Sequence, residues 1–224
     1  MNESYQLIYE SRFETAIDQT KPDDFQLNSG NITYPSKKFV ISRSSGGLVL
    51  STYGDATHWD LTPYRTAASQ DTKLFWNNIP YQTVDEAKWL TFIMIYLVST
   101  GRSGALTVGT IYNYHKVIKK LCHYANEKSI SITEVLASEQ NVTKFINSKV
   151  NSSSILIYFT AFLGHLLELG ETQTGVPTLG LKAITDIRAL RESIQDSKQH
   201  PVIPPRIFSG FLSELWSLIF SFKK

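Results

Sequence analysis

The sequence predicts a mainly α-helical protein with a small β-hairpin region near its N-terminus and linker helices toward its C-terminal end. Three observations predict this class. Residues 106–128 repeat apolar side chains at the spacing of an amphipathic helix, and residues 83–98 are almost continuously apolar behind a helix-start signal. Two short runs typical of β-strands, 38–43 and 47–53, flank a Ser-Ser-Gly turn. With 224 residues, 42% of them hydrophobic, the chain is long and apolar enough to bury a core.

Residues 1–82 form the N-terminal region that contains this hairpin. Residues 21–37 are rich in Pro, Asp, Asn, Ser and Gly and are predicted to be a loop. After the hairpin come side chains that we expect to pack it against the helices: Trp59, Leu61, Tyr64, Leu74, Phe75 and Trp76. Stacking of such an aromatic ring on a nucleic-acid base is the alternative, and core packing is the stronger expectation.

The first predicted helix begins after Thr83 and extends to about Val98. Thr83 and Glu86 have the spacing of a capping box, with Thr83 as the N-cap and Glu86 three positions later. The segment is apolar on nearly all sides, which indicates a central, buried helix. A Gly- and Ser-rich loop that contains Arg102 follows it. A cation and backbone NH groups could meet a phosphate there, but a solvated arginine is the preferred interpretation.

The segment from Leu106 to Lys128 is the helix around which we expect the protein to be organised. Its apolar side is formed by Ile111, Tyr114, Val117, Ile118, Leu121, Cys122 and Ala125. Its polar side is formed by Tyr112, Asn113, Lys116, Lys119, Lys120 and His123. Lysines suit a phosphate backbone, and Asn or His can reach base edges. An ordinary solvated surface is the alternative, and from this helix alone it is the preferred interpretation.

Further helical segments complete the chain. Short elements at 132–136 and 139–146 lead to a helix at 155–169, for which Ser153 or Ser154 is the predicted N-cap and Gly170 the end. Residues 181–195 predict an amphipathic helix, the prolines of 197–205 an extended linker, and residues 206–220 an apolar terminal helix. We therefore expect three parts: 1–82, a helical domain at 83–170, and 171–224.

Composition and motifs exclude several classes of function. The net charge of +2 implies no general polyelectrolyte partner, and Cys122 can form no internal disulfide. No signal peptide opens the chain, and the longest apolar run is shorter than the roughly 20 residues of a membrane span, so a soluble, cytoplasmic protein is expected. The histidines, glycines and acidic residues match no metal, nucleotide-binding or hydrolase motif. The sequence thus predicts no metal, no cofactor and no complete enzyme site.

The order of these elements carries a family resemblance. The stretches TVDEAKWLTFIMIYLVSTGRSGALTVGTIYNYHKVIKKLCHYANEK and SSSILIYFTAFLGHLLELG, followed by KQHPVIPPRIFSGFLSEL, resemble the core-binding (SAM-like) domain of tyrosine recombinases, the phage-type integrases, and its junction with the catalytic domain. The resemblance covers about residues 83–215 and implies a four-helix SAM-like bundle that clamps double-stranded DNA.

The resemblance also implies which residues contact DNA. These are Tyr112, Asn113, Lys116, Lys119, Lys120 and His123, together with Ser153 and Tyr158 on the later helix. Arg102, in the Gly- and Ser-rich loop, is a further candidate that the composition of the loop offers. The family's catalytic Arg, His-x-x-Arg and Tyr motifs are not found, so we expect DNA binding in site-specific recombination or integration without strand cleavage. The helix at 155–169 has no Lys or Arg, which departs from a DNA-contacting helix. The alternative is a protein-interaction module that associates, or self-associates, through its apolar terminal helix.

Overall fold

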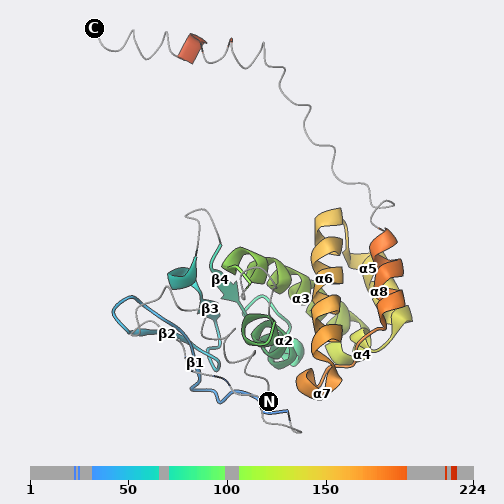
Figure 1. Ribbon diagram of the computed structural model, residues 1–224, viewed down its shortest axis with the longest axis horizontal. Coiled ribbons are helices and arrows are strands. Elements are labelled where there is room, and N and C mark those ends of the chain that lie inside the picture. Colours follow the sequence, from blue (N-terminus) through green and yellow to red (C-terminus); the bar gives the residue numbers. More distant parts are fainter. Residues whose placement is uncertain are drawn as a thin grey trace.

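The computed structural model of the chain describes residues 23, 25, 32–65, 71–98, 106–190, 210 and 213–215 (Figure 1). The predicted loop that contains Arg102, the proline-rich linker and most of the terminal helix lie outside these residues. Within the described residues the protein is mainly helical and has two small antiparallel strand pairs, as the sequence predicts at the level of fold class.

The predicted β-hairpin is confirmed. Strand β1 (Val40–Arg43) pairs antiparallel with β2 (Val49–Thr52), and the register shifts between them mark an irregular ladder. A second pair, β3 (His58–Asp60) with β4 (Lys73–Phe75), was not predicted as strands. Short 3-10 turns follow β3 (η2, Thr62–Tyr64) and precede the first described helix (η3, Tyr81–Thr83). Three-residue strands are too short to show a reliable two-residue period.

Helix α2 (Val84–Tyr96) lies at the centre of the fold, as its apolar sequence predicts. Phe92 is fully buried and contacts the aromatic rings of Phe39 and Tyr53 from the hairpin, with centroid distances of 5.4 and 5.6 Å. The Trp89 ring stacks on that of Phe92, and its indole NH donates to the carbonyl oxygen of Thr174 at 2.7 Å. From Ala87 to Tyr96 every residue of α2 is buried.

The capping box predicted at the start of α2 is wrong. The Thr83 hydroxyl makes no cap hydrogen bond and donates instead to the Pro80 carbonyl oxygen at 3.0 Å. The Glu86 carboxylate accepts from the backbone NH groups of Ile132 and Thr133, at 3.1 and 3.3 Å, and so caps helix α4. The first NH groups of α4 have no partner within their own helix, and the Glu86 carboxylate accepts from two of them. It is therefore not available to cap the start of α2.

Helix α3 (Val108–Lys128) begins at Thr107, whose hydroxyl accepts from the Thr110 NH, and ends at Ser129 in a left-handed conformation. All seven residues of its predicted apolar side are buried. Burial raises the pKa of the Cys122 thiol to about 12, which fits its predicted role as a small buried hydrophobe. The amphipathic pattern therefore identified the orientation of this helix correctly.

The remaining helices are α4 (Ile132–Leu136), α5 (Glu139–Lys149), α6 (Ser153–Leu169), α7 (Glu171–Thr174) and α8 (Leu181–Ala189). The N-cap of α6 is Ser152, so the prediction of Ser153 or Ser154 is wrong by one residue or more. A capping box does occur at α4, between Ser131 and Glu134. Gly170, with φ of +78°, ends α6 as predicted.

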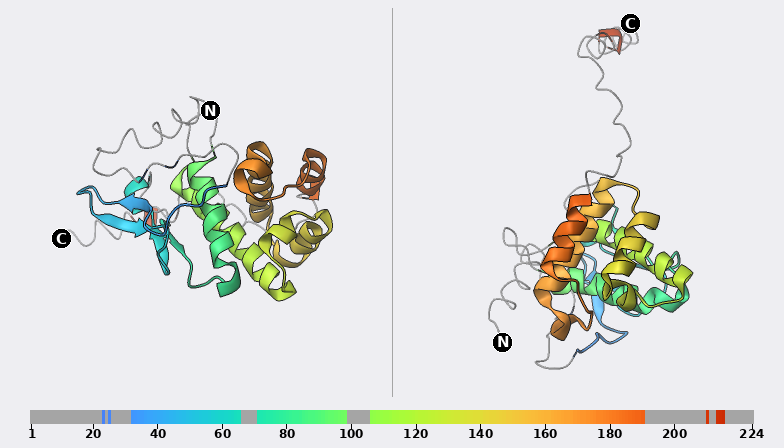
Figure 2. Two further views of the ribbon diagram at one scale, coloured as in Figure 1. Left: turned by 90° about the horizontal axis from the view of Figure 1, so that it is seen from below. Right: turned by 90° about the vertical axis from the view of Figure 1, so that its right-hand side faces the viewer.

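The elements form three successive layers. Figures 1 and 2 show the strands on one side, α2 and α3 in the middle, and α4 to α8 on the other side. One continuous cluster of buried side chains extends from Phe39 in the hairpin to Ile187 in α8. The middle layer is therefore covered on two sides, and the polar side of α3 is the part of that layer that remains at the surface.

Candidate nucleic-acid interface

The polar side of α3 is a narrow strip at the protein surface. Lys116 and His123 are exposed, whereas Tyr112, Asn113, Lys119 and Lys120 are half-buried. We call these six residues the α3 strip. From Tyr112 to His123 the strip is about 16 Å long, because each helical residue rises about 1.5 Å.

The three lysines of the α3 strip have no acidic partner among the residues that the structure describes. Within the described part of the chain, no carboxylate forms an ion pair with Lys116, Lys119 or Lys120. The Lys116 ammonium lies 4.4 Å from the centroid of the Tyr112 ring, one helical turn earlier. The Lys120 ammonium donates to the carbonyl oxygen of Lys149 at 3.1 Å, at the end of α5 where the helix dipole favours a cation.

The segment 71–78, which includes β4, borders one edge of the strip. The ring nitrogens of His115 and His123 lie within hydrogen-bonding distance of carbonyl oxygens of this segment: Nε2 of His115 is 3.2 Å from that of Phe75, and Nε2 of His123 is 3.0 Å from that of Asn78. Because a carbonyl oxygen only accepts, both Nε2 atoms carry the hydrogen. Burial and a hydrogen bond with the Asp71 carboxylate raise the pKa of Tyr112, at the start of the strip. The end of α5 lies at the other edge.

His115 belongs to the core and not to the strip. It is only 4% exposed, and its ring packs edge-on against Trp76 at a centroid distance of 4.9 Å. Burial, with a smaller effect from Lys119, lowers the pKa of His115 to about 4. The side chain is therefore neutral at pH 7, and its role is to attach α3 to β4.

The candidates on α6 lie apart from the lysines. Ser153 is only 7% exposed. Tyr158 is half-buried and contacts the ring of Tyr114, with centroids 5.9 Å apart. Tyr114 points into the core on the opposite side of α3 from Lys116. The structure thus brings together the six α3 candidates, leaves Ser153 and Tyr158 outside that surface, and does not describe Arg102.

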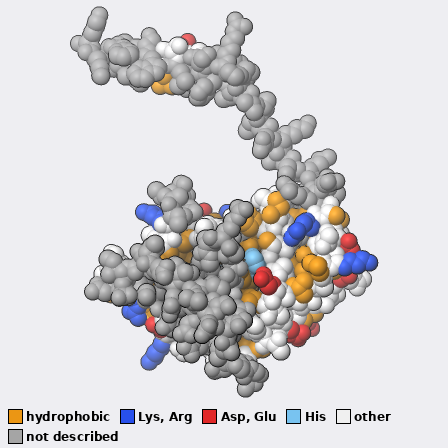
Figure 3. All heavy atoms as spheres, in the orientation of Figure 1, with side chains coloured by type: hydrophobic (Ala, Val, Ile, Leu, Met, Phe, Trp, Pro, Cys, Tyr) orange, Lys and Arg blue, Asp and Glu red, His pale blue; other side chains and the backbone are white. Residues whose placement is uncertain are grey.

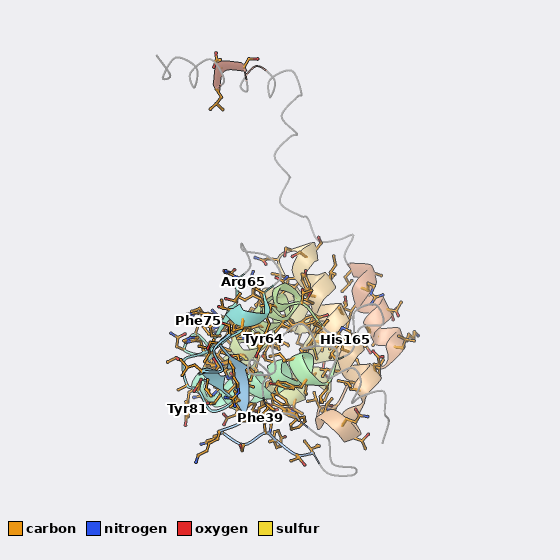
Figure 4. All side chains as sticks on the ribbon, turned by 60° about the vertical axis from the view of Figure 1, so that its left-hand side comes forward. Phe39, Tyr64, Arg65, Phe75, Tyr81 and His165 are labelled. Carbon is orange, nitrogen blue, oxygen red and sulfur yellow. The ribbon has the colours of Figure 1, made fainter. Side chains whose placement is uncertain are left out.

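Two aromatic side chains beside the strip were missed as a surface feature. These are His58 and Phe75, of which Phe75 is 44% exposed as a residue. The centroids of their rings lie 5.4 Å apart, and the ring planes meet at 38°. Figure 4 places Phe75 at the outer edge of the strand layer, far from His165 on α6. The sequence grouped Phe75 with the core aromatics, although Lys73, Leu74 and Phe75 alternate between exposed, buried and exposed. The sequence carries no signal of this alternation, because Leu74, Phe75 and Trp76 form a continuous apolar run.

Away from the α3 strip, the described residues form a cleft. This cleft, of about 390 Å³, lies between the hairpin, α2, α4 and the end of α7, and Tyr34, Lys37, Asp85 and Trp89 are among its lining residues. The described residues contain no group of three or more His, Cys, Asp or Glu side chains that could hold a metal ion. Over α6 and α8, Figure 3 shows apolar side chains interspersed with isolated charges of both signs.

Comparison with known proteins assigns no family to this chain. No protein-family model, no curated protein and no solved structure matches it. Among the described helices, none is both long and apolar enough to cross a membrane.

Proposed function

We propose that the chain binds double-stranded DNA through the α3 strip and does not cleave it. The observation that carries the proposal is the line of exposed Lys116 and half-buried Lys119 and Lys120 along one side of α3, which no described carboxylate neutralises. The resemblance of residues 83–215 to the core-binding domain of tyrosine recombinases supports it, as does the order of helices α2, α3 and α6. In this proposal the helical part is a SAM-like domain of a protein that acts in site-specific DNA recombination or integration.

The dimensions of the strip suit a phosphate backbone. A strip of about 16 Å spans roughly five phosphates of one strand, because charges on one strand recur about every 3.4 Å along the duplex axis. The lysines supply three positive charges, and Asn113 is the candidate for reading a base edge, because its amide can both donate and accept hydrogen bonds. Three phosphate contacts correspond to a slope of about −2.7 in a plot of log affinity against log salt concentration.

The experiment measures how affinity for a duplex oligonucleotide depends on salt. We expect the triple variant K116A/K119A/K120A to bind more weakly and to lose most of that slope, since each lost phosphate contact removes about 0.9 from it. A matched control removes three lysines elsewhere, K38A/K144A/K182A, and changes the net charge equally. Equal losses in the two variants, or no loss in the first, would refute the role of the α3 strip.

A protein-interaction module is the second candidate function, and one observation favours it. The β2 strand and the residue before it expose Leu48, Val49 and Leu50, and Leu48 is 70% exposed. Consecutive exposed apolar residues are typical of contact surfaces. Sedimentation of the wild type, of L48S/L50S and of a chain lacking residues 207–224 distinguishes association through the hairpin from association through the terminal segment. A monomer at all concentrations would exclude self-association.

A further inference from the structure

The outer face of the β3–β4 ribbon carries an aromatic pair. In this ribbon His58 is opposite Phe75 and Asp60 is opposite Lys73, and all four belong to the same face. The other face is formed by Trp59 and Leu74, which are fully buried. The Phe75 ring therefore remains at the surface because its neighbours in sequence take up the core positions.

This aromatic pair adjoins the α3 strip. The Phe75 carbonyl accepts the hydrogen bond from His115, so the free edge of β4 lies against α3. Lys119 is one helical turn beyond His115, on the side that reaches the surface. The outer face of the ribbon and the α3 strip are thus adjacent parts of one surface.

The charges around the aromatic pair permit an anionic strand. The Asp60 carboxylate is paired with the Lys73 ammonium at 3.4 Å, so its charge is compensated. Asp71 lies at the Tyr112 end of the strip, and Glu127, which is paired with Lys149, follows His123 by one helical turn. The middle of the strip, around Lys116, Lys119 and Lys120, is therefore the more favourable path for phosphates. An exposed aromatic ring beside uncompensated lysines is the combination that single-stranded nucleic-acid sites use, with bases stacked on rings and phosphates held by cations.

We propose that Phe75, backed by His58, stacks an unpaired DNA base while the α3 lysines hold the phosphates of the same strand. This inference rests on the proposed function and adds to it a preference for DNA with unpaired nucleotides next to a duplex. A fully paired duplex keeps its base faces covered, so it gains nothing from Phe75. A strand that leaves the duplex at this surface gains one stacking contact.

The test compares two probes, a blunt duplex and the same duplex with a short oligothymidine overhang, by fluorescence anisotropy. We expect the wild-type protein to bind the overhang probe more tightly, and F75A to lose about tenfold in affinity for that probe alone. F75L keeps the apolar volume without an aromatic face and should behave like F75A. F75W should retain the preference, and its indole fluorescence should be quenched by the overhang probe only.

Controls separate this inference from the proposed function. L181A removes an exposed apolar side chain from α8 and should leave both affinities unchanged. Thermal unfolding of each variant shows that the fold is intact, and F75W provides the test if F75A unfolds. If F75A and F75L keep the overhang preference within about twofold, stacking on Phe75 is refuted, while loss of duplex binding in K116A/K119A/K120A still supports the DNA-binding proposal. If that triple variant binds as the wild type does, the proposed function fails and this inference fails with it.

Discussion

Acid should destabilise this protein through His115. The imidazole is buried between α3 and β4. The Phe75 carbonyl accepts its Nε2 hydrogen, and its Nδ1 atom has no hydrogen-bond partner among the described residues. Burial lowers the pKa of His115 to about 4, from an ordinary value of 6.5. The folded state therefore binds fewer protons than the unfolded state between these two values, and the free energy of unfolding must fall as the pH falls through that interval.

The magnitude follows from the difference between the two pKa values. A difference of about 2.5, at about 1.4 kcal/mol for each pH unit, corresponds to about 3 kcal/mol. The stabilisation is fully present above pH 6.5 and is lost progressively down to about pH 4. Below that pH, His115 is protonated in both states and contributes no further change. A domain of ordinary stability would lose a large part of its free energy of unfolding.

The assay is urea unfolding at a series of pH values between 4 and 8, with wild type and two variants. The Gln side chain in H115Q retains a donor for the Phe75 carbonyl and does not titrate, so its stability should depend less on pH by about 3 kcal/mol over this range. H123Q, at an exposed position, is the matched control and should follow the wild type. Burial also lowers the pKa of His165, so some pH dependence remains in H115Q. Identical pH profiles for H115Q and the wild type would refute the reasoning.

Two further predictions concern backbone and capping positions. E86A should reduce the free energy of unfolding by about 1–2 kcal/mol, because it removes the acceptor that caps α4. The control D85A, at the neighbouring exposed position, should change it by less than about 0.5 kcal/mol. Equal losses for the two variants in urea unfolding would contradict the capping role. G175A should destabilise by about 1 kcal/mol or more, since Gly175 has φ of +68° and a Cβ there would lie 2.6 Å from the Ile32 side chain. G164A, inside α6 with open space around it, should stabilise by roughly 0.5–1 kcal/mol. Thermal unfolding measures both changes, and shifts of the same sign would disprove the contrast.

The sequence predicted those features of the fold that depend on local patterns. The period of α3 placed Ile118 and Leu121 in the core and Lys116 at the surface, because the apolar residues of this segment gather on a single side of the helix. The buried helix α2 was identified from its continuously apolar run, and the hairpin from two short β-type runs on either side of a turn. Gly170 could be assigned as the end of α6, since few residues adopt a positive φ there.

The candidate site was predictable only in part. The six residues of the α3 strip share one helix, so their common face follows from sequence spacing. Phe75 could not be placed beside them, because the hydrogen bond from His115 that joins the two elements spans 40 residues. Whether Phe75 or Trp76 is buried depends on the pairing of β3 with β4, and three-residue strands carry too little pattern to show it.

By itself, then, the sequence determined the main helices, their inward faces and the hairpin, because these follow from side-chain periodicity within one segment. Only the tertiary structure decided that Glu86 caps α4, that His115 is buried and neutral, and that β4, which carries Phe75, lies against α3. Each of these depends on hydrogen bonds between groups that are far apart in the sequence, or on the burial of one element by another. Both are decided only when the elements pack together.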